Sequence, residues 1–460
     1  MSATLEQTKA AGSPSVRELG ARAKAASRVL APVSGARRNA VLEAMAKAIE
    51  RAAGAILKAN AEDVRRAEQA KGDDGLTAAT LARLKLDEAK LRDVVEQVRS
   101  VAALPDPLGR VLDAVELDDG GPAGVEKKDQ GLHLQKISVP LGVLAVIFEA
   151  RPDAVTQIAS LAIKSGNAVI LKPGREVETT ARALADVLRA ALRDEGLPED
   201  AITLVLGREQ VRALLDAHDC VDLVIPRGSK ALVEFVQANT RIPVLGHSEG
   251  VCHIYVDRAA DPELALRVIA DAKLDYPAAC NAVETVLVHE EIAASFVPRL
   301  AAELQSRGVR AHGDKVVREI VNANSGSQMT EVKDWHREYG EPELAIGVVE
   351  SVEAAIAHIH WYGSAHTESI LTEDAAVAER FLREVDAAGV FHNASTRFAD
   401  GFRYGFGAEV GISTSKFHAR GPVGLEGLTT YKYVLRGHGH VAGDYRGANA
   451  RRFTHRRGSK

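Results

Sequence analysis

The chain has 460 residues, of which 46% are hydrophobic and 26% are charged, and its formal net charge is −5. This length predicts two or three domains rather than one, and the composition excludes a disordered chain and a basic, nucleic-acid-binding surface. Aromatic residues make up only 4%, so an aliphatic core with α/β layering is favoured over an aromatic-rich sandwich.

No segment reaches the roughly 20 apolar residues that a membrane-spanning helix requires. The longest apolar run, 139–148, contains Pro140 and Gly142 and is typical of a buried strand. Three cysteines in a chain of this length do not form a disulfide framework and indicate a reducing compartment. We therefore expect a soluble, cytoplasmic protein with no membrane partner.

The first part of the chain predicts mainly helices. Residues 1–14 are small and polar and are expected to be disordered. Apolar residues recur at helical spacing over 16–68, which predicts two or three helices, and a further helix is predicted over 87–103. Residues 117–124 are rich in Gly and Asp and predict a turn, which is followed by an extended strand over 132–139.

From residue 142 onward, short β-branched runs alternate with helical segments. The expected strands are 142–148, 168–172, 202–206, 221–225 and 242–245. The expected helices between them are 153–165, 179–195, 210–217 and 230–238. The alternation resumes after residue 251, with strands near 252–256, 284–289, 346–349 and 389–392. This pattern is typical of βαβ units, so we expect two α/β domains with parallel sheets. The basic tail over 446–460 is expected to be disordered.

The two common nucleotide-binding patterns are absent from the sequence. It contains no Gly-x-x-x-x-Gly-Lys-Ser/Thr, and no Gly-x-Gly-x-x-Gly between a predicted strand and a predicted helix. A nucleotide would have to bind through a different arrangement.

Cys280 lies in a loop of small residues just before the predicted strand 284–289. A thiol in such a loop is accessible to a substrate and a cofactor, which is typical of a nucleophile. A buried, hydrophobic cysteine is the alternative, and the loop alone leaves both interpretations open. For Cys220 and Cys252, which border or lie in strands, we favour a place in the core.

Two other groups of residues remain ambiguous. Lys416, His418 and Arg420 form a cationic cluster that either meets an anionic substrate or belongs to a solvated loop. The histidines at 358 and 360 lie on different faces of a helix, and no Cys or carboxylate completes a ligand set with His366, so no metal site is expected.

Several segments, taken together, indicate a known family. They are Val139-Pro-Leu-Gly-Val, Phe148-Glu-Ala-Arg-Pro, Lys164-Ser-Gly-Asn-Ala-Val-Ile-Leu, Asp222-Leu-Val-Ile-Pro-Arg-Gly, Cys252-His-Ile-Tyr-Val-Asp, Cys280-Asn-Ala-Val-Glu-Thr, Asn393-Ala-Ser-Thr-Arg-Phe and His418-Ala-Arg-Gly-Pro-Val-Gly-Leu. The chain resembles the aldehyde dehydrogenase superfamily, and within it the glutamate-5-semialdehyde dehydrogenases, or γ-glutamyl phosphate reductases. The resemblance extends from about residue 16 to 440.

The resemblance implies an α/β, aldehyde dehydrogenase-like fold with three parts. A Rossmann-like NADP-binding domain would span 15–118 and 139–246, and an α/β catalytic domain would span 247–425. A small β-strand flap, 119–138 and 426–440, would pair subunits. Because an exposed ribbon needs a partner edge, we expect a homo-oligomer, either a dimer or a tetramer.

The resemblance also implies a reaction: the NADPH-dependent reduction of L-glutamyl 5-phosphate to L-glutamate 5-semialdehyde and phosphate, in proline biosynthesis. The thiolate of Cys280 would attack the acyl phosphate and form a thioester, which hydride then reduces. The backbone N–H of Cys280 and one further donor would hold the oxyanion. Glutamate 5-kinase is the candidate protein partner.

Two positions differ from the hydrolytic relatives. Val244 stands where they carry a water-activating Glu, and Ala150 stands where they carry the oxyanion-binding Asn. A water-activating base would lose the thioester to hydrolysis, so its absence favours acyl-phosphate chemistry. The alternatives are a hydrolytic NAD(P)-dependent aldehyde dehydrogenase, a non-catalytic relative, and a thiol hydrolase that pairs Cys280 with a His.

The resemblance implies two sets of binding residues. Those for the cofactor are Lys172, Gly174, Arg175, Gly228 and Ser229. Those for the substrate are Arg151, Asn281, Asn393, Arg397, His418 and Arg420. The superfamily segment Lys-Pro-x-Glu reads Lys172-Pro-Gly-Arg here, and an Arg in place of the carboxylate suits a 2′-phosphate, which favours NADPH over NADH.

Overall fold

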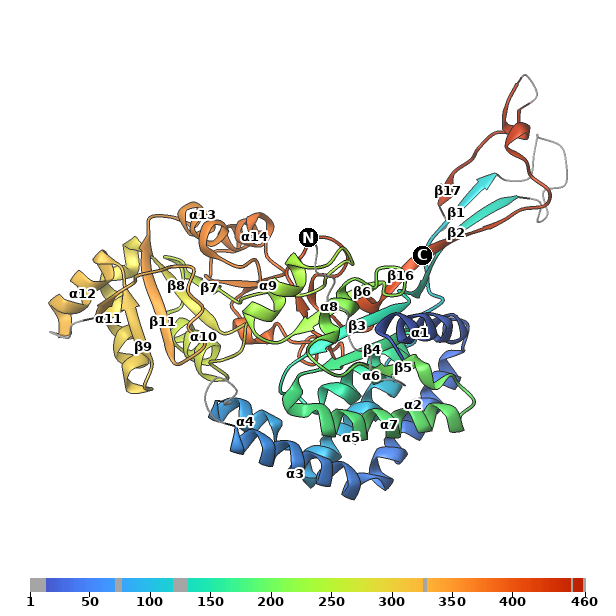
Figure 1. Ribbon diagram of the computed structural model, residues 1–460. Helices are drawn as coiled ribbons and strands as arrows, with labels where there is room; N and C mark the ends of the chain where they lie inside the picture. Colours follow the sequence, from blue (N-terminus) through green and yellow to red (C-terminus); the bar gives the residue numbers. More distant parts are fainter. Residues whose placement is uncertain (1–13, 71–76, 119–130, 326–328, 448–449, 458–460) are drawn as a thin grey trace, which may run out of the picture. The chain divides into compact units, whose positions relative to one another are not determined.

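The computed structural model describes residues 14–70, 77–118, 131–325, 329–447 and 450–457 (Figure 1). The chain forms two compact units, and each is described by itself. Unit 1 comprises 1–228, 236–244 and 425–460, and unit 2 comprises 229–235 and 245–424. The assignment of a cofactor domain and a catalytic domain to these units remains a prediction.

The described part of unit 1 begins with five helices, four of which start at a polar capping residue. They are α1 (Val16–Leu30), α2 (Gly35–Arg51), α3 (Ala53–Gln69), α4 (Ala78–Leu84) and α5 (Glu88–Ala103). The side chains of Ser15, Ser34, Thr77 and Asp87 each accept a backbone N–H from the first turn that follows, which satisfies a donor that the helix itself leaves unpaired. Four of these helices confirm the sequence-based prediction, and α4 was not predicted.

The core of unit 1 is a parallel sheet of four strands in the order β5-β4-β3-β6. The strands are β3 (Val143–Phe148), β4 (Ala168–Pro173), β5 (Ile202–Leu204) and β6 (Leu223–Arg227), and the helices that follow them are α6 (Ala154–Lys164), α7 (Glu178–Asp194), α8 (Gln210–Leu215) and α9 (Lys230–Ala238). Every residue of β3 and β4 is buried. Because successive side chains of a strand point to opposite faces, both faces of the sheet are covered.

The predicted strand 242–245 is wrong. Only one isolated bridge forms there, between Val224 and Val244. The backbone N–H of Val224 donates to the carbonyl of Pro243 at 2.9 Å, but Pro243 has no N–H to continue a ladder.

A second sheet of unit 1 is antiparallel and projects from the helices as a ribbon (Figure 1). Its strands, in the order β16-β2-β1-β17, are β16 (Thr429–Arg436), β2 (Leu132–Pro140), β1 (Val111–Asp118) and β17 (Arg456–Arg457). We call this sheet the flap. The strand predicted over 132–139 is β2, whereas β1 was not predicted, and residues 119–130 of the expected flap lie outside the described residues.

The described part of the C-terminal tail is folded, contrary to the prediction of disorder over 446–460. Arg451 pairs with the buried Asp118 at 2.6 Å, and Arg456 and Arg457 of β17 pair with β1. The ring of Phe453 stacks on Tyr445 with 4.3 Å between the centroids. The prediction relied on the basic composition and did not anticipate the acidic partner on β1.

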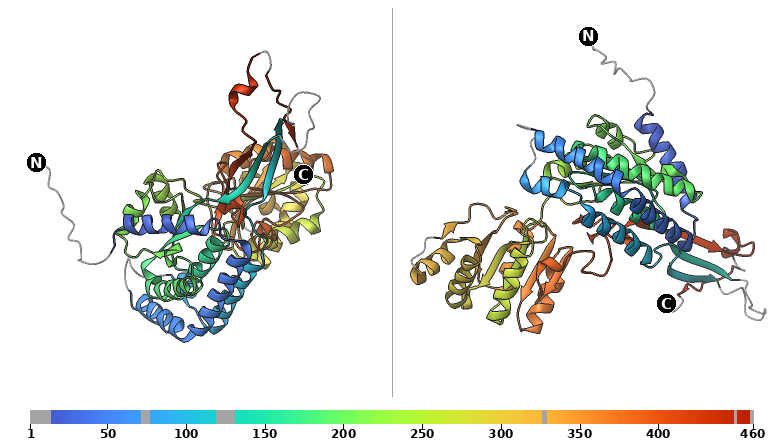
Figure 2. Two further views of the ribbon diagram at one scale, coloured as in Figure 1. Left: turned by 90° about the vertical axis from the view of Figure 1, so that its right-hand side faces the viewer. Right: turned by 90° about the horizontal axis from the view of Figure 1, so that it is seen from below.

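Unit 2 contains a parallel sheet of seven strands in the order β10-β9-β11-β8-β7-β12-β13. The strands are β7 (Cys252–Val256), β8 (Val283–His289), β9 (Arg310–Gly313), β10 (Thr330–Glu331), β11 (Glu343–Val349), β12 (Thr367–Leu371) and β13 (Gly389–His392). The helices are α10 (Pro262–Leu274), α11 (Glu290–Ser306), α12 (Lys315–Ser325), α13 (Val352–Tyr362) and α14 (Ala375–Glu384). Figure 2 shows this unit, in yellow and orange, from two further sides.

Alternate residues of β7 face two separate hydrophobic clusters. Ile254 and Val256 pack with α10, α11 and α12, whereas Tyr255 packs with α13 and α14. The sheet therefore lies between two helical layers. A short antiparallel pair, β14 (Ile412–Ser413) and β15 (Gly421–Pro422), follows later in the chain. None of the helices that the structure describes is long and apolar enough to cross a membrane.

Candidate active site

Three side chains that precede neighbouring strands of unit 2 meet at one edge of its sheet. His247 precedes β7, Cys280 precedes β8 and His366 directly precedes β12, and these strands are adjacent in the order β8-β7-β12. Because the strands are parallel, their amino ends lie at the same edge. One donor atom of each side chain lies within 4.8 Å of the others. We call these three residues the thiol cluster.

The hydrogen bonds of the thiol cluster fix how its rings are oriented. The Sγ atom of Cys280 lies 3.2 Å from Nε2 of the buried His366, whose Nδ1 lies 2.8 Å from the hydroxyl of Thr367. Nδ1 of His247 lies 3.0 Å from the carbonyl oxygen of Ile412. Since a carbonyl only accepts, Nδ1 of His247 carries the hydrogen, and Nε2 keeps its lone pair when the ring is neutral.

A glycine allows the chain to pass close to the backbone of Cys280. A Cβ atom at Gly250 would lie 1.8 Å from the carbonyl oxygen of Cys280, so no other residue fits at this position without a backbone shift. The thiol of Cys252 donates to the same carbonyl at 3.3 Å. The segment before β7 therefore supports the Cys280 loop directly.

The surroundings of Cys280 favour the neutral thiol. Burial raises the pKa of Cys280 to about 12, and the charges of Glu338 and Glu409 add to the increase. Burial also lowers the pKa of His366 to about 3. The proposed nucleophile is the thiolate, whereas these surroundings favour the thiol because burial disfavours the charged form.

Asn281 and Arg397 belong to a buried network next to Cys280. Nη1 of Arg397 donates to Oδ1 of Asn281, and Nδ2 of Asn281 donates to the carbonyl of Ala399 at 2.9 Å. Nε of Arg397 pairs with Asp275 at 3.0 Å, and only 9% of Arg397 is exposed. This guanidinium was expected to bind substrate, but its contacts indicate that it holds Asn281 in place.

Asn393 lies at the opposite edge of the sheet from Cys280. It follows the carboxyl end of β13, and its side-chain oxygen accepts the N–H of Thr372, which follows the carboxyl end of β12. The thiol cluster lies at the amino ends, and a strand of five residues spans roughly 16 Å. Asn393 therefore lies away from Cys280, and its expected contact with the substrate or oxyanion stays a prediction that this placement does not support. At φ 53°, it instead reverses the chain.

His418 and Arg420 lie in the loop between β14 and β15. His418 is exposed with φ 69°, and Nη1 of Arg420 pairs with Asp386 at 2.9 Å. Nε and Nη2 of Arg420 are buried and have no hydrogen-bond partner among the described residues. The loop is tied to the thiol cluster through Ile412 of β14. Arg420 thus combines a location near the cluster with unused donors.

The residues expected to bind the cofactor gather at the carboxyl edge of the sheet in unit 1. Pro173, Phe148 and Arg227 lie side by side at the carboxyl ends of β4, β3 and β6. The segments that follow these strand ends hold Arg151, Gly174, Arg175 and Gly228, whereas Ser229 begins the part of the chain assigned to unit 2. The strands β4 and β5 follow on one side of β3, whereas β6 lies on its other side, so the strand order reverses at β3. This carboxyl edge is therefore a topological switch point, where such sheets bind dinucleotides.

Lys172 is almost completely buried at this edge. Its Nζ donates to the carbonyl of Pro173 at 2.6 Å, and burial lowers its pKa, while the charges of Glu178, Glu176 and Glu209 oppose that change. Glu176 also accepts the backbone N–H of Ala150 at 2.5 Å. Arg175 is exposed. The sequence analysis overlooked Glu176, which keeps a carboxylate close to the expected ribose site.

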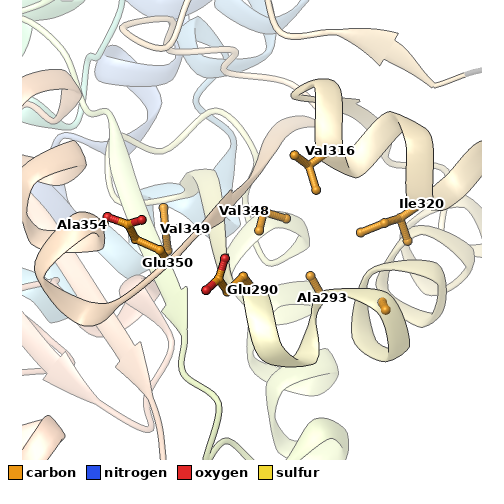
Figure 3. A pocket seen from close by; sticks show the side chains of 9 residues that line it. Glu290, Ala293, Val316, Ile320, Val348, Val349, Glu350 and Ala354 are labelled. Carbon is orange, nitrogen blue, oxygen red and sulfur yellow. The ribbon is translucent and has the colours of Figure 1, made fainter.

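A separate hollow of about 500 Å³ opens between α11, α12 and the carboxyl end of β11 (Figure 3). Glu290 and Glu350 line it together with apolar side chains such as Val316 and Ile320. It lies at the carboxyl edge of the sheet, away from the thiol cluster, and no Cys or His is among its lining residues. It therefore lacks the groups for nucleophilic catalysis.

Sequence reasoning missed His247 and assigned no role to His366. It considered His366 only with His358 and His360, whose contacts are different: His358 packs against Trp335, and His360 accepts the N–H of Asp386. The strand β12, which places His366 beside Cys280, was not predicted from the sequence.

Comparisons with known proteins agree on one family. The model of the aldehyde dehydrogenase family matches residues 2–341. Gamma-glutamyl phosphate reductase of Synechococcus elongatus is 53% identical over 388 residues, covering 84% of this chain and 86% of the relative. The crystal structure of gamma-glutamyl phosphate reductase from Thermotoga maritima matches with a TM-score of 0.85 and 38% identity, covering 92% of this chain and 99% of that chain. An acetylating aldehyde dehydrogenase from Geobacillus thermoglucosidasius, 19% identical with a TM-score of 0.61, covers 93% of this chain and 97% of that chain and shares the fold.

Proposed function

The chain belongs to the γ-glutamyl phosphate reductases of the aldehyde dehydrogenase family, and we propose that it reduces L-glutamyl 5-phosphate to L-glutamate 5-semialdehyde and phosphate with NADPH. The observation that carries the proposal is the 53% identity to a relative of that name over 84% of the chain. The chain is accordingly an oxidoreductase with the aldehyde dehydrogenase fold, and this family implies a nicotinamide cofactor. The geometry at Cys280 is consistent with the proposed chemistry.

In the proposed reaction, Sγ of Cys280 bonds to the acyl carbon, the bond from that carbon to the phosphate oxygen breaks, and phosphate leaves with the electron pair. The thiol proton must leave at the same time. Nε2 of His366 lies 3.2 Å from the sulfur, but with a pKa of about 3 this imidazole is a weak base. The departing phosphate is the better acceptor, because its leaving oxygen gains negative charge as the bond to the acyl carbon breaks.

The groups around Cys280 then serve the thioester. When bound, NADPH supplies the hydride that reduces it. The backbone N–H of Cys280 and the second N–H of the Asn281 amide are the donors we propose for the oxyanion. Arg397 fixes the Asn281 side chain through its oxygen, which leaves the amide N–H groups to donate.

Two competing functions are weaker. A hydrolytic aldehyde dehydrogenase needs a base for water, and Val244 supplies none. A thiol hydrolase is suggested by the 3.2 Å contact of Cys280 with His366. However, the partner of Nδ1 is the hydroxyl of Thr367 rather than a carboxylate, and a thiol with a pKa of about 12 does not transfer its proton to an imidazole with a pKa of about 3.

We also propose that the carboxyl edge of unit 1 binds NADPH. Two residues at this edge support NADPH binding. At Gly174 a Cβ atom would lie 2.2 Å from the carboxylate of Glu176, and the neighbouring Arg175 is exposed. Arg175 would pair with the 2′-phosphate, and Lys172 would contact the ribose. For the substrate, the proposed cationic groups are Arg151, His418 and Arg420, of which Arg420 has unused donors.

Finally, we propose that the flap joins subunits into a homo-oligomer. The edge strand β16 exposes Tyr431, Tyr433 and Leu435, which alternate along it and therefore share one face. Replacing Tyr433 by Lys should reduce the mass measured by light scattering, whereas the same change at Trp361, which is 72% exposed in unit 2, should not. An unchanged mass of the Tyr433→Lys variant would refute the proposal.

Glutamate 5-kinase is the proposed source of the substrate, in the cytoplasm. Co-purification of the two enzymes would test this partnership.

The reverse reaction tests the central proposal. Glutamate semialdehyde and NADP⁺ are added to the wild-type protein, to Cys280→Ser and to the matched control Cys220→Ser, with and without inorganic phosphate, and NADPH absorbance is followed. We expect phosphate-dependent NADPH formation that is lost only in Cys280→Ser. Turnover without phosphate would instead identify a hydrolytic dehydrogenase, and full activity of Cys280→Ser would exclude the proposed nucleophile.

A further inference from the structure

The thiol cluster contains the donor types of a metal site. One thiol and two imidazoles, with donor atoms within 4.8 Å of one another, come from the starts of three neighbouring strands. Cysteine sulfur and histidine nitrogen are the usual ligands of Zn²⁺, and three protein ligands with an open fourth position are typical of an accessible zinc centre. Acyl transfer requires only the thiol of Cys280, so the two imidazoles of the cluster are available for metal binding.

The orientation of both rings supports metal ligation. His247 donates its Nδ1 hydrogen to the carbonyl of Ile412, and Nδ1 of His366 lies 2.8 Å from the hydroxyl of Thr367. Histidines that ligate metals commonly direct one nitrogen to such an oxygen, which fixes the ring and leaves the other nitrogen for the metal. Nε2 is that other nitrogen in both residues, and in His366 it already faces the sulfur.

The spacing requires only a small adjustment. With metal–nitrogen bonds of about 2.0 Å and metal–sulfur bonds of about 2.3 Å, tetrahedral ligand atoms lie roughly 3.3–3.6 Å apart. The sulfur and Nε2 of His366 are already 3.2 Å apart, and no donor pair exceeds 4.8 Å. A contraction of about 1 Å, within the reach of side-chain rotation, closes the set around an ion.

The charges near the cluster also favour a cation. Glu338 and Glu409 lie close enough to act electrostatically on the sulfur of Cys280, and both are acidic. A divalent cation at the sulfur would be attracted by both carboxylates, so the acidic surroundings agree with the geometry of the three ligands.

We propose that His247, Cys280 and His366 bind one divalent ion of the Zn²⁺ class through Nε2, Sγ and Nε2. Binding forms one metal–sulfur and two metal–nitrogen bonds, and the thiol proton passes to the buffer. The ion covers the sulfur, so it blocks acyl transfer reversibly and protects the thiol from oxidation. Only this last consequence rests on the proposed function, because binding itself is independent of turnover.

Cobalt(II) provides a test that does not depend on activity. The reduced full-length chain is titrated with Co²⁺ alone, and the near-ultraviolet sulfur-to-metal charge-transfer band and the visible bands are recorded. We expect about one Co²⁺ per chain, with visible bands typical of tetrahedral geometry, and displacement by Zn²⁺. Separately, Zn²⁺ should inhibit any measured turnover, and a chelator should restore it.

Variants locate the site. Cys280→Ser should remove the charge-transfer band, and His247→Gln and His366→Gln should each weaken Co²⁺ binding at least tenfold. The matched controls Cys220→Ser and His218→Gln should bind as the wild type does. If thermal melting shows that His366→Gln does not fold, Co²⁺ binding to the His247→Gln variant tests the proposal instead, because His247 is partly exposed. Binding without a charge-transfer band, or unchanged binding in His247→Gln, would overturn the proposal, whether or not the protein is a reductase.

Discussion

Replacing Gly250 by Ala tests whether the position of Cys280 depends on the close approach of the chain before β7. The added Cβ atom would lie 1.8 Å from the carbonyl oxygen of Cys280, where real contacts are at least 3.0 Å. The two segments must therefore separate by about 1.2 Å. The clash is between a Cβ atom and a backbone carbonyl oxygen, so rotation of a side chain cannot relieve it.

The expected loss follows from that shift. A displacement of about 1 Å at a reacting group costs about 10²-fold in rate, which corresponds to about 2.7 kcal/mol of transition-state stabilisation. The strain should also lower the free energy of unfolding by about 1–3 kcal/mol, as overpacking does. We expect the main loss in kcat, because Cys280 is displaced while the binding groups for the cofactor in unit 1 are untouched.

The assay measures kcat and KM in the reverse reaction together with the rate of thiol labelling. Gly54→Ala is the matched control, because a Cβ atom there meets nothing within 4 Å and Ala favours the helix α3. A Gly250→Ala enzyme with kcat within threefold of the wild type and unchanged labelling would refute the reasoning, since the loop would then tolerate the shift.

Three further predictions follow from charges that the structure places. Arg175→Glu should shift cofactor preference from NADPH toward NADH by at least tenfold in kcat/KM, because the carboxylate repels a 2′-phosphate; equal losses with both cofactors would contradict this. Lys273→Met leaves the buried Glu284 without its partner at 2.8 Å and should lower the free energy of unfolding by about 3–5 kcal/mol. Because burial raises the pKa of Glu284, this loss should be smaller at pH 5.5 than at pH 8, and urea denaturation at both values measures it. With a pKa of about 12, Cys280 should react with iodoacetamide about tenfold faster per pH unit from pH 7 to 9, relative to Cys280→Ser, and a plateau in this range would show a lower pKa.

The alternation of apolar runs was sufficient to predict most of the fold. The predicted strands at 252–256 and 389–392 coincide with β7 and β13. Both strands consist mainly of apolar residues, and β7 is buried throughout, so their pattern is visible locally. The strand β12 was missed because the polar residues Glu368 and Ser369 are fully buried within it. Oε2 of Glu368 accepts from the backbone N–H of His253 on the neighbouring strand and lies 3.0 Å from its Nδ1. A buried polar pair of this kind cannot be recognised from one strand alone.

The candidate site was predicted only in part for the same reason. Cys280 could be found from its own loop and from the family segments. His247 and His366 become neighbours of Cys280 only through the order β8-β7-β12, which depends on contacts between distant segments. The placement of Asn393 away from Cys280 could not be predicted, because its motif shows proximity in sequence to β13 but not the edge of the sheet at which it lies.

The pairing of β2 with β16 has a consequence for how the protein is made. The ribosome completes β2 about 290 residues before β16, an interval of roughly 15–60 s at bacterial rates of synthesis. Throughout that time, one edge of β2 in the nascent chain has no partner strand. Chains stalled before residue 425 should therefore be more sensitive to protease at β2 than complete chains, and equal sensitivity would show that another segment shields this edge. The strand β16 thus closes a sheet whose strand β2 is translated much earlier, so truncations before residue 429 should lower solubility more than they disturb early folding.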